Sequence, residues 1–369
     1  MGRVPTVAVG QKDDPTIHWN ALRADYVSQT DTLRQHLGTA SVIVKQGDGA
    51  DFIDTVNSYA GEKKIEVPKG DYIINDKVTL KDANCTWIKG PAPGSLTEGA
   101  RLIFRTDGEI SLENTAGKSL SRVVFENLGF QDYGYYASVA YEASKVIHGN
   151  NFLTGSAPPN AERIWDFQLK NCHFYRFTKD LGGGDYCVPV DLPNLEHALF
   201  EHNVMHRGCK YLIRLYVADD YEMGNNRIIN NYFGMAEEGG IAQRACIYTN
   251  GGIYSRGNQF LGSVAEDKPV AYVYENAFVA NIHCSPAGFF GPNDRTEGMG
   301  YMKIVGADAN HKIKNGRISG NMIGEYNHAD QNMLDIIWMI EDIAVRFAGQ
   351  WLYSDKVTIL TNITGHIFE

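Results

Sequence analysis

Acidic residues gather in the middle of this 369-residue sequence, and their types suggest carbohydrate chemistry. Glycoside hydrolysis needs a protonated carboxyl group and an ionised carboxylate on opposite sides of a sugar ring. Asp219, Asp220 and Glu222 share the segment VADDYEMGNN, and Glu237 follows in the next stretch of the chain. We take these four carboxylates as candidate catalytic residues. The competing interpretation is that they are solvated turn residues, which are common in a protein of net charge −10.

Aromatic and basic residues accompany the acids and indicate how a sugar could be held. Tyr216 and Tyr221 flank the carboxylates and offer aromatic faces on which sugar rings can stack. Asp185 and Tyr186 lie in a glycine-rich stretch that reads as a loop, where binding groups commonly sit. Arg214 is one of several nearby cations of the kind that a lyase needs beside its base. We assign substrate binding to these five residues and leave hydrolase and lyase chemistry both open.

Several other classes of protein are disfavoured. The net charge argues against nonspecific binding to nucleic acid or to an anionic membrane surface. The sequence contains no run of about 18 apolar residues, the length needed to span a bilayer. No signal-peptide-like segment follows Met1, so we expect synthesis in the cytosol. There is no glycine-rich phosphate loop with a lysine, and His197, His202 and His206 lack a convergent third ligand. We therefore expect neither a cofactor nor a bound metal.

The six cysteines are widely spaced and include no C-x-x-C pair. This spacing disfavours a zinc ribbon or a dithiol redox site. Buried free thiols that act as small apolar side chains are the expected state of these residues.

A pattern of an apolar strand, an asparagine and a further apolar residue recurs through the chain. It is found at Asn127, Asn171, Asn203, Asn231, Asn258, Asn281, Asn321 and Asn362. The spacings of 28 residues (203 to 231) and 27 residues (231 to 258) are typical of the coils of a β-solenoid. Asparagine tolerates left-handed backbone, and its amide can bond to an asparagine on the next coil. The pattern favours a solenoid over a β-sandwich, whose strands would show regular hairpin signals.

The stretch 46–75 combines several local signals in a fixed order. Gly47-Asp48-Gly49 predicts a tight turn, and an apolar stripe from Asp51 predicts a short helix with Asp51 as its N-cap. Strands are then expected at 64–67 and 72–75, joined by a turn that contains Pro68 and Gly70. The order of turn, helix, strand, P-x-G and strand is much more specific than any one of these signals.

This order resembles the opening of the pectate-lyase-like superfamily of right-handed parallel β-helices. A helical segment before the motif, together with the missing signal peptide, is similar to bacteriophage tailspikes. The resemblance implies an all-β fold, a right-handed single-stranded parallel β-helix assembled as a homotrimer. It further implies a location in the virion tail, attachment to a tail or adaptor protein through the N-terminal segment, and recognition or depolymerisation of a host cell-surface polysaccharide.

We divide the chain into a helical attachment segment at 1–40, a parallel β-helix at 41–330 and C-terminal coils or a cap at 331–369. Residues 331–348 fit helical and strand patterns alike, and strands are favoured. Long intervals in the repeat predict loops that leave the scaffold within 134–163 and 182–194. Two alternative functions stay open: a non-catalytic structural or adhesive spike, and a polysaccharide lyase or hydrolase that is not attached to a virion.

Overall fold

Short strands rich in β-branched and aromatic residues dominate the chain. The computed structural model describes residues 41–59, 63–81, 84–91, 99–115, 119–150, 163–183, 185–208, 211–216, 226–235, 245–249, 253–256, 258–261, 272–274, 281–284, 288–290, 302–305, 314–319, 322–324, 334–337, 346–348, 351–352, 359–361 and 367–368. The expected attachment segment at 1–40 lies outside these residues.

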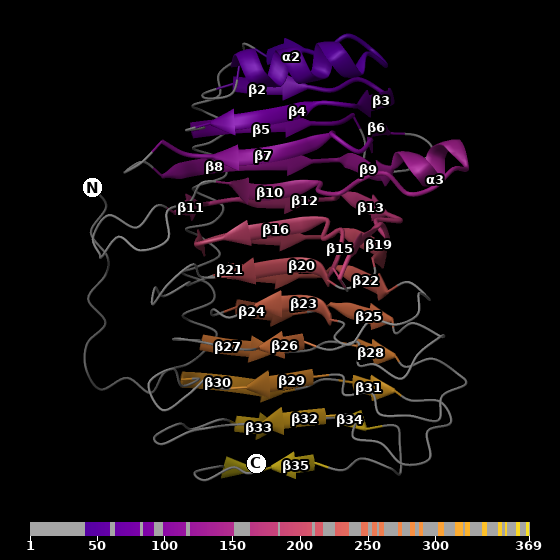
Figure 1. Ribbon diagram of the computed structural model, residues 1–369. Helices are drawn as coiled ribbons and strands as arrows, with labels where there is room; N and C mark the ends of the chain where they lie inside the picture. Colours follow the sequence, from indigo (N-terminus) through magenta and orange to yellow (C-terminus); the bar gives the residue numbers. More distant parts are fainter. Residues whose placement is uncertain are drawn as a thin grey trace, which may run out of the picture. The chain divides into compact units, whose positions relative to one another are not determined.

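The strands stack into three parallel sheets, and successive strands pass from sheet A to sheet B to sheet C (Figure 1). The main path of sheet A contains β1 (Ser41–Ile43), β2 (Lys63–Glu66), β5 (Asn84–Lys89), β8 (Leu120–Glu126), β12 (Gln168–Lys170), β18 (Leu199–Glu201), β21 (Asn226–Ile229), β24 (Ile253–Arg256), β27 (Asn281–Cys284), β30 (Lys314–Ser319), β33 (Arg346–Ala348) and β36 (Ile367–Phe368).

Sheet B contains β3 (Gly70–Ile74), β6 (Ala100–Phe104), β9 (Leu128–Asp132), β13 (His173–Tyr175), β19 (Val204–Gly208), β22 (Tyr232–Met235), β25 (Gln259–Leu261), β28 (Gly288–Phe290), β31 (Met322–Gly324) and β34 (Trp351–Leu352). Sheet C contains β4 (Lys77–Lys81), β7 (Glu109–Glu113), β10 (Ile147–Asn150), β16 (Val190–Pro193), β20 (Tyr211–Tyr216), β23 (Ala245–Thr249), β26 (Tyr272–Tyr274), β29 (Met302–Val305), β32 (Leu334–Ile337) and β35 (Ile359–Thr361).

Helices and a hairpin interrupt this pattern. Helix α2 (Gly49–Tyr59) lies at the first coils, and α3 (Tyr133–Ala137) follows β9 (Figure 1). The antiparallel hairpin of β14 (Asp180–Gly182) and β15 (Asp185–Tyr186) lies between β13 and β16 in sequence. Strands β11 (Ile164–Trp165) and β17 (Leu195–Glu196) pair with each other at the side of sheet A.

In-register stacking builds the core. In sheet B, Leu102 pairs with Phe130, Phe130 with Phe174, and Phe174 with Met205, and all four side chains are buried. The rings of Phe130 and Phe174 stack with centroids 4.3 Å apart. Because each apolar residue rests on its counterpart in the neighbouring coil, one continuous apolar column forms. The expected parallel β-helix is confirmed.

A buried asparagine ladder marks the turn between sheets A and B. Asn203 Nδ2 donates to Asn231 Oδ1 at 2.9 Å, and Asn231 Nδ2 donates to Asn258 Oδ1 at 3.0 Å. These three asparagines are those with the most regular spacing in the sequence. Cys172 takes the same place one coil earlier, and its backbone N–H donates to Asn203 Oδ1 at 2.9 Å.

The other asparagines of the pattern do not continue this ladder. Asn127 and Asn171 lie one position earlier in their coils, with left-handed φ of 60° and 51°. Asn281 lies in strand β27 rather than in a turn. Asn321 and Asn362 fall outside the described residues. The sequence pattern therefore matched two different structural positions: a turn residue with left-handed backbone and a buried residue of the ladder.

The opening motif folds as expected, with one correction. Gly47 has a left-handed φ of 68°, and a Cβ added to Gly49 would lie 2.1 Å from the Ile73 carbonyl oxygen. The N-cap of α2 is Asp48 rather than Asp51, because Asp48 Oδ1 accepts a hydrogen bond from the Asp51 N–H at 3.1 Å. Asp51 Oδ2 instead accepts from the Lys45 N–H at 2.6 Å.

The C-terminal stretch contains strands where it is described. β32 and β33 fall within the ambiguous segment 331–348 and continue sheets C and A. Cys85, Cys172 and Cys187 are buried free thiols, as predicted for this class of cysteine. Within the described ranges, neither helix has the length and apolar character needed to cross a bilayer.

Candidate functional site

Two excursions leave the β-helix at the corner between sheets B and C. The first, residues 133–146, contains α3 and joins β9 to β10. The second, residues 176–189, carries the β14–β15 hairpin and joins β13 to β16. They belong to adjacent coils, because β10 pairs directly with β16. They overlap the ranges 134–163 and 182–194, where the sequence predicted loops leaving the scaffold, but those ranges also contain the sheet strands β10 and β16.

Sheet C supplies a column of polar residues beside these excursions. His148 on β10 pairs with Asp191 on β16, and Asp191 pairs with Arg214 on β20. Their neighbours Ile147, Val190 and Ile213 are buried in the core, so the polar side chains take the opposite, outer face. Parallel register thus brings three residues from distant parts of the chain into one row.

Arg214 and Asp191 form a two-pronged ion pair. Arg214 Nε donates to Asp191 Oδ1 at 2.7 Å, and its Nη2 donates to Asp191 Oδ2. The guanidinium carbon also lies 5.4 Å from the centre of the Tyr216 ring. Burial disfavours the charged guanidinium, but the Asp191 carboxylate outweighs this effect, and the pKa of Arg214 lies above its ordinary value. The cation is therefore fixed in position and permanently charged.

These groups line a cavity of about 350 Å³. Its lining comes from the first excursion, from the hairpin and its exit, and from sheet C, and comprises Ser144, Lys145, His148, Gly149, Leu181, Asp185, Tyr186, Val188, Asp191, Arg214 and Tyr216. The volume is within the range of small-ligand pockets. Burial, with a smaller contribution from Asp191, raises the pKa of Tyr216, so this phenol remains protonated at neutral pH.

A close contact with Glu109 is the second polar feature at this edge of sheet C. His148 Nε2 lies 3.0 Å from Glu109 Oε2, and the His148 side chain is almost completely buried. The nearby His148 outweighs the opposing effect of burial, and the pKa of Glu109 falls below its ordinary value. Lys145 also approaches Glu109, with its Nζ 3.9 Å from Oε2. Glu109 thus anchors two of the residues that line the cavity.

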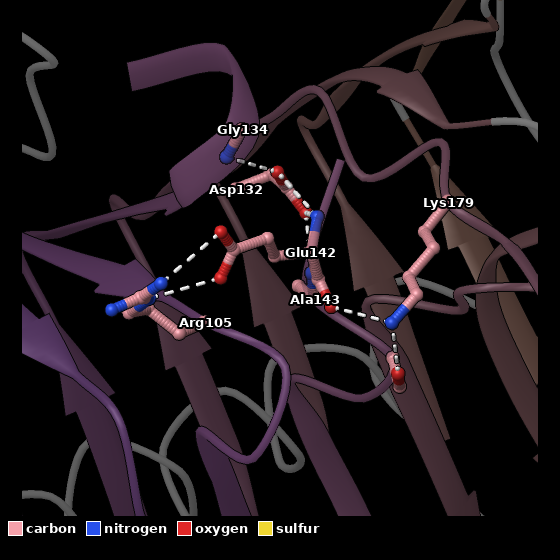
Figure 2. Close-up of polar contacts among 7 residues, drawn as sticks. Arg105, Asp132, Gly134, Glu142, Ala143 and Lys179 are labelled. Carbon is pink, nitrogen blue, oxygen red and sulfur yellow. Dashed lines mark hydrogen bonds and ion pairs between the residues drawn. The ribbon is translucent and has the colours of Figure 1, made fainter. Parts of the chain in front are cut away.

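A buried carboxylate shapes the first excursion (Figure 2). Asp132 accepts hydrogen bonds from the N–H groups of Gly134 at 2.6 Å, Glu142 at 3.1 Å and Ala143 at 2.7 Å. Burial nevertheless raises the pKa of Asp132. Since these bonds tie the start of α3 and the later loop residues 142–143 to one side chain, Asp132 sets the path that leads to Ser144 and Lys145.

Lys179 connects the two excursions (Figure 2). It precedes the hairpin, and its Nζ donates to the carbonyl oxygen of Glu142 and to Ser144 Oγ, each at 2.9 Å. On the other side, Arg105 Nε donates to Glu142 Oε2 at 2.9 Å. These contacts join two walls of the cavity across adjacent coils.

The structure brings together part of the predicted site. Four of the five residues assigned to substrate binding, Asp185, Tyr186, Arg214 and Tyr216, line the same cavity. The fifth, Tyr221, lies outside the described residues. The catalytic candidates Asp219, Asp220, Glu222 and Glu237 also lie outside them. Asp191, which was not among the predicted site residues, is a central residue of the cavity.

Sequence reasoning missed Lys145 and His148. Both lie where the first excursion returns to sheet C, which the interval after Asn127 indicated only as a loop. Strand register with Asp191 and Arg214 would have revealed them, but register depends on the lengths of the intervening loops. In the part of the chain that is described, no three His, Cys, Asp or Glu side chains come together as a metal site.

Comparisons with known proteins give likeness of structure only. No family profile and no curated protein sequence matches this chain. Among solved structures, the A-module of mannuronan C-5 epimerase AlgE4 from Azotobacter vinelandii is 14% identical, with 91% of this chain and 99% of that one covered and a TM-score of 0.40. An alginate lyase from Paenibacillus sp. str. FPU-7 is 12% identical, with 86% and 97% covered and a TM-score of 0.36. ORF18 of Geobacillus virus E2 is 14% identical, with 95% and 63% covered and a TM-score of 0.30.

Proposed function

We propose that this protein binds a cell-surface polysaccharide in the cavity beside sheet C. The observation that carries the proposal is the lining of that cavity. It combines a fixed, two-pronged Arg214–Asp191 pair with the phenol groups of Tyr186 and Tyr216. Planar charged groups orient sugar hydroxyls through paired hydrogen bonds, and aromatic faces cover the apolar side of a sugar ring.

The walls of the cavity support binding of a ligand without large rearrangement. Its floor is a hydrogen-bonded sheet, and its walls are tied together by Asp132 and Lys179. A pre-organised site loses less free energy on binding than a site that must first become ordered. A rigid β-helix face is thus suited to a long, repetitive polymer that presents the same groups to successive coils.

The first experiment measures binding of purified protein to surface polysaccharides from candidate host cells. Arg214→Ala removes the central cation, and we expect affinity to fall by about tenfold or more. Arg101→Ala is the matched control. Arg101 forms the same type of two-pronged pair with Asp71, also across adjacent coils, but on sheet B and away from the cavity lining. Equal losses in both variants, or no loss in Arg214→Ala, would contradict the proposal.

Hydrolysis of the bound polysaccharide is a second candidate function. Two carboxylates, Asp185 from the hairpin and Asp191 from the sheet, line the same cavity. A pair of this kind is what glycoside hydrolysis requires. New reducing ends formed by the wild type but not by Asp185→Asn would support a hydrolase. Formation of an ultraviolet-absorbing unsaturated product would instead indicate a lyase, and saturable binding without either product would leave a receptor-binding protein.

The biological setting that we propose is a tailspike. On this view the protein is a homotrimer in a phage virion tail, attached to a tail or adaptor protein by its N-terminal segment. The sequence layout supports this proposal, because a predicted helical segment precedes the opening motif of the β-helix. Immunogold labelling of virions with antibody to this protein would test the location, and absence of label from the tail would contradict it.

A further inference from the structure

A second group of aromatic and basic residues lies on sheet B, outside the cavity. Tyr135 of α3, Tyr175 of β13, His206 of β19 and Tyr232 of β22 form a column of rings. Successive ring centroids are 5.0, 5.7 and 6.0 Å apart. Gly234 makes room for this column, because a Cβ there would lie 2.7 Å from His206 Cδ2. Tyr175, His206 and Tyr232 come from three adjacent coils of the β-helix, and Tyr135 extends the column from α3.

Arg176 and Arg207 directly follow two residues of this column. Tyr175 and His206 pair in register, and the N–H of Arg176 donates to the His206 carbonyl oxygen at 3.0 Å. Both arginines have left-handed backbone, with φ of 63° and 64°. Arg207 also lies where the pairing of β19 with β22 shifts register, an irregularity that redirects a side chain. Two cationic residues therefore occupy matching turns one coil apart.

Within the described part of the chain, these two arginines lack the carboxylate partners that several other arginines have. Arg101, Arg105, Arg163 and Arg214 each form an ion pair with a carboxylate. Among the residues that the structure describes, no carboxylate lies within 4.0 Å of Arg176 or Arg207. Like charges on adjacent coils repel each other, and leaving them uncompensated costs stability. Such an arrangement is typical of a site whose counter-charge arrives with a ligand.

Arg176 is held in place by aromatic groups. Its Nη1 donates to the Tyr141 hydroxyl at 3.3 Å, and its guanidinium carbon lies 4.9 Å from the centre of the Tyr135 ring. Its Nε is buried and has no hydrogen-bond partner within the described part of the chain. A buried N–H without an acceptor is unfavourable, and a bound acceptor would remove this cost.

The neighbouring titratable groups respond to the same positive potential. Burial lowers the pKa of His206, and the charges of Arg207 and Arg176 lower it further. Burial alone would raise the pKa of Tyr175, but hydrogen bonds from Tyr135 and Arg176 and the charges of both arginines outweigh it and lower that pKa. Both effects identify a local excess of positive charge in a protein whose net charge is −10.

We propose that Arg176 and Arg207, with the hydroxyl groups of Tyr135 and Tyr175, bind an oxyanion carried by an acidic polysaccharide. Carboxylate, sulfate and phosphate groups share the required chemistry, since each presents two oxygens to an arginine fork. The ring column beside the arginines supplies apolar contact for the adjoining sugar. Tyr135 and Arg176 belong to the same two excursions as the cavity walls, but none of the four residues lines the cavity.

The experiment uses His206 as a reporter of bound anion. Its pKa is measured by NMR titration in sodium chloride and in sodium sulfate of equal ionic strength, with the His206 resonance assigned from His206→Gln. We expect sulfate to raise this pKa by about half a unit or more, because a bound anion offsets the arginine charges. In Arg176→Gln/Arg207→Gln, the pKa in chloride should already be higher, and sulfate should not change it.

Matched variants separate a specific site from general charge. Arg101→Gln removes a cation from the same sheet, and the sulfate response should persist. Arg214→Ala should retain the response as well, so failure here and failure of the cavity proposal are distinguishable. If the double variant at 176 and 207 unfolds, Arg207→Gln alone is used, and it should weaken the response. An unchanged His206 pKa in sulfate, or equal responses in all variants, would overturn the site.

A final comparison identifies the source of the anion. Oligogalacturonate carries carboxylates, heparin-derived oligosaccharides carry sulfates and carboxylates, and malto-oligosaccharides are neutral. At least one acidic oligosaccharide should raise the His206 pKa at a concentration about tenfold lower than sulfate, because the polymer adds contacts along the ring column. If none acts at a lower concentration than sulfate, or if the neutral sugar acts equally, the assignment to an acidic polysaccharide is overturned.

Discussion

Glu109 shows how a single residue on the outer face of sheet C can support a neighbouring site. Its carboxylate pairs with the buried His148 and approaches Lys145, and both of these line the cavity. It lies one coil before His148 in the stack, beneath the first of the two excursions. The residue has no contact with the cavity itself, so its role is to position the groups that do.

This pair predicts a specific pH dependence. Because the pKa of Glu109 is lower in the folded protein than its ordinary value of 4.5, the unfolded chain binds the proton more readily. The stabilisation from Glu109 is thus complete above pH 4.5 and is lost as the pH falls through the folded-state pKa. Glu109→Gln should lower the free energy of unfolding by about 1 kcal/mol at neutral pH, and by less in acid.

Urea unfolding at several pH values would check this prediction. Glu109→Gln/His148→Gln serves as a control, because it removes both partners and should flatten the pH dependence to the same extent. A difference between wild type and Glu109→Gln that stays constant from neutral to acidic pH would show that the ionised Glu109 carboxylate does not stabilise the fold.

At the scale of elements, the two excursions convert a regular stack into a site. They leave adjacent coils at the same corner, and hydrogen bonds from Lys179 join them. The sheet beneath them supplies fixed positions, whereas the excursions supply walls. Loss of the contacts that shape an excursion should therefore affect binding more than it affects the sheet.

Asp132→Ala tests this division. The change leaves the N–H groups of Gly134, Glu142 and Ala143 without their acceptor, and we expect the free energy of unfolding to fall by about 2–3 kcal/mol. Hydrogen exchange should accelerate at residues 134–143 and remain slow in β10 and β16, and polysaccharide binding should weaken.

Asp180→Ala is the control, since Asp180 is exposed and accepts a local bond from the Gly182 N–H at 2.7 Å. Unchanged exchange at 134–143 would exclude a shaping role for Asp132.

The asparagine ladder also acts at the scale of elements, because it connects neighbouring coils through side-chain hydrogen bonds. Asn231 is buried, accepts from Asn203 Nδ2 and donates to Asn258 Oδ1, so it connects three coils. Asn231→Ala should lower the free energy of unfolding by about 2–4 kcal/mol, because several buried groups lose their partners together. Asn230→Gly provides a neighbouring control. Asn230 has a left-handed φ of 55°, which glycine adopts without strain, and this variant should be close to wild type in thermal unfolding. Equal stability of the two variants would show that the ladder contributes little.

At the scale of the whole molecule, self-association is the open question of greatest consequence. We expect a homotrimer, and sedimentation equilibrium should therefore give three times the subunit mass of 41.0 kDa. Dilution across the micromolar range should not dissociate a stable spike. A single species of subunit mass would contradict the tailspike proposal while leaving polysaccharide binding in the cavity intact.

The sequence alone determined the type of fold. Stacking in a solenoid is a relation between neighbouring coils, so successive coils repeat similar local requirements: inward apolar residues, a turn and strands of similar length. The opening turn, helix and strands were also predictable, because Gly47, Gly49 and Pro68 constrain only nearby backbone. The choice of N-cap between Asp48 and Asp51 was not, since both carboxylates lie within reach of the first turn.

Only the tertiary structure decided how the site is assembled. His148, Asp191 and Arg214 form one row because of strand register, and register between coils depends on the lengths and paths of the excursions that separate them. The sequence indicated suitable chemistry for four residues of the cavity, namely Asp185, Tyr186, Arg214 and Tyr216. It did not show on which face of a sheet each side chain lies. Likewise, only the neighbours in space reveal that Arg176 and Arg207 have no carboxylate partner among the residues that the structure describes. Local patterns specify a coil, whereas the positions of groups on different coils depend on the whole stack.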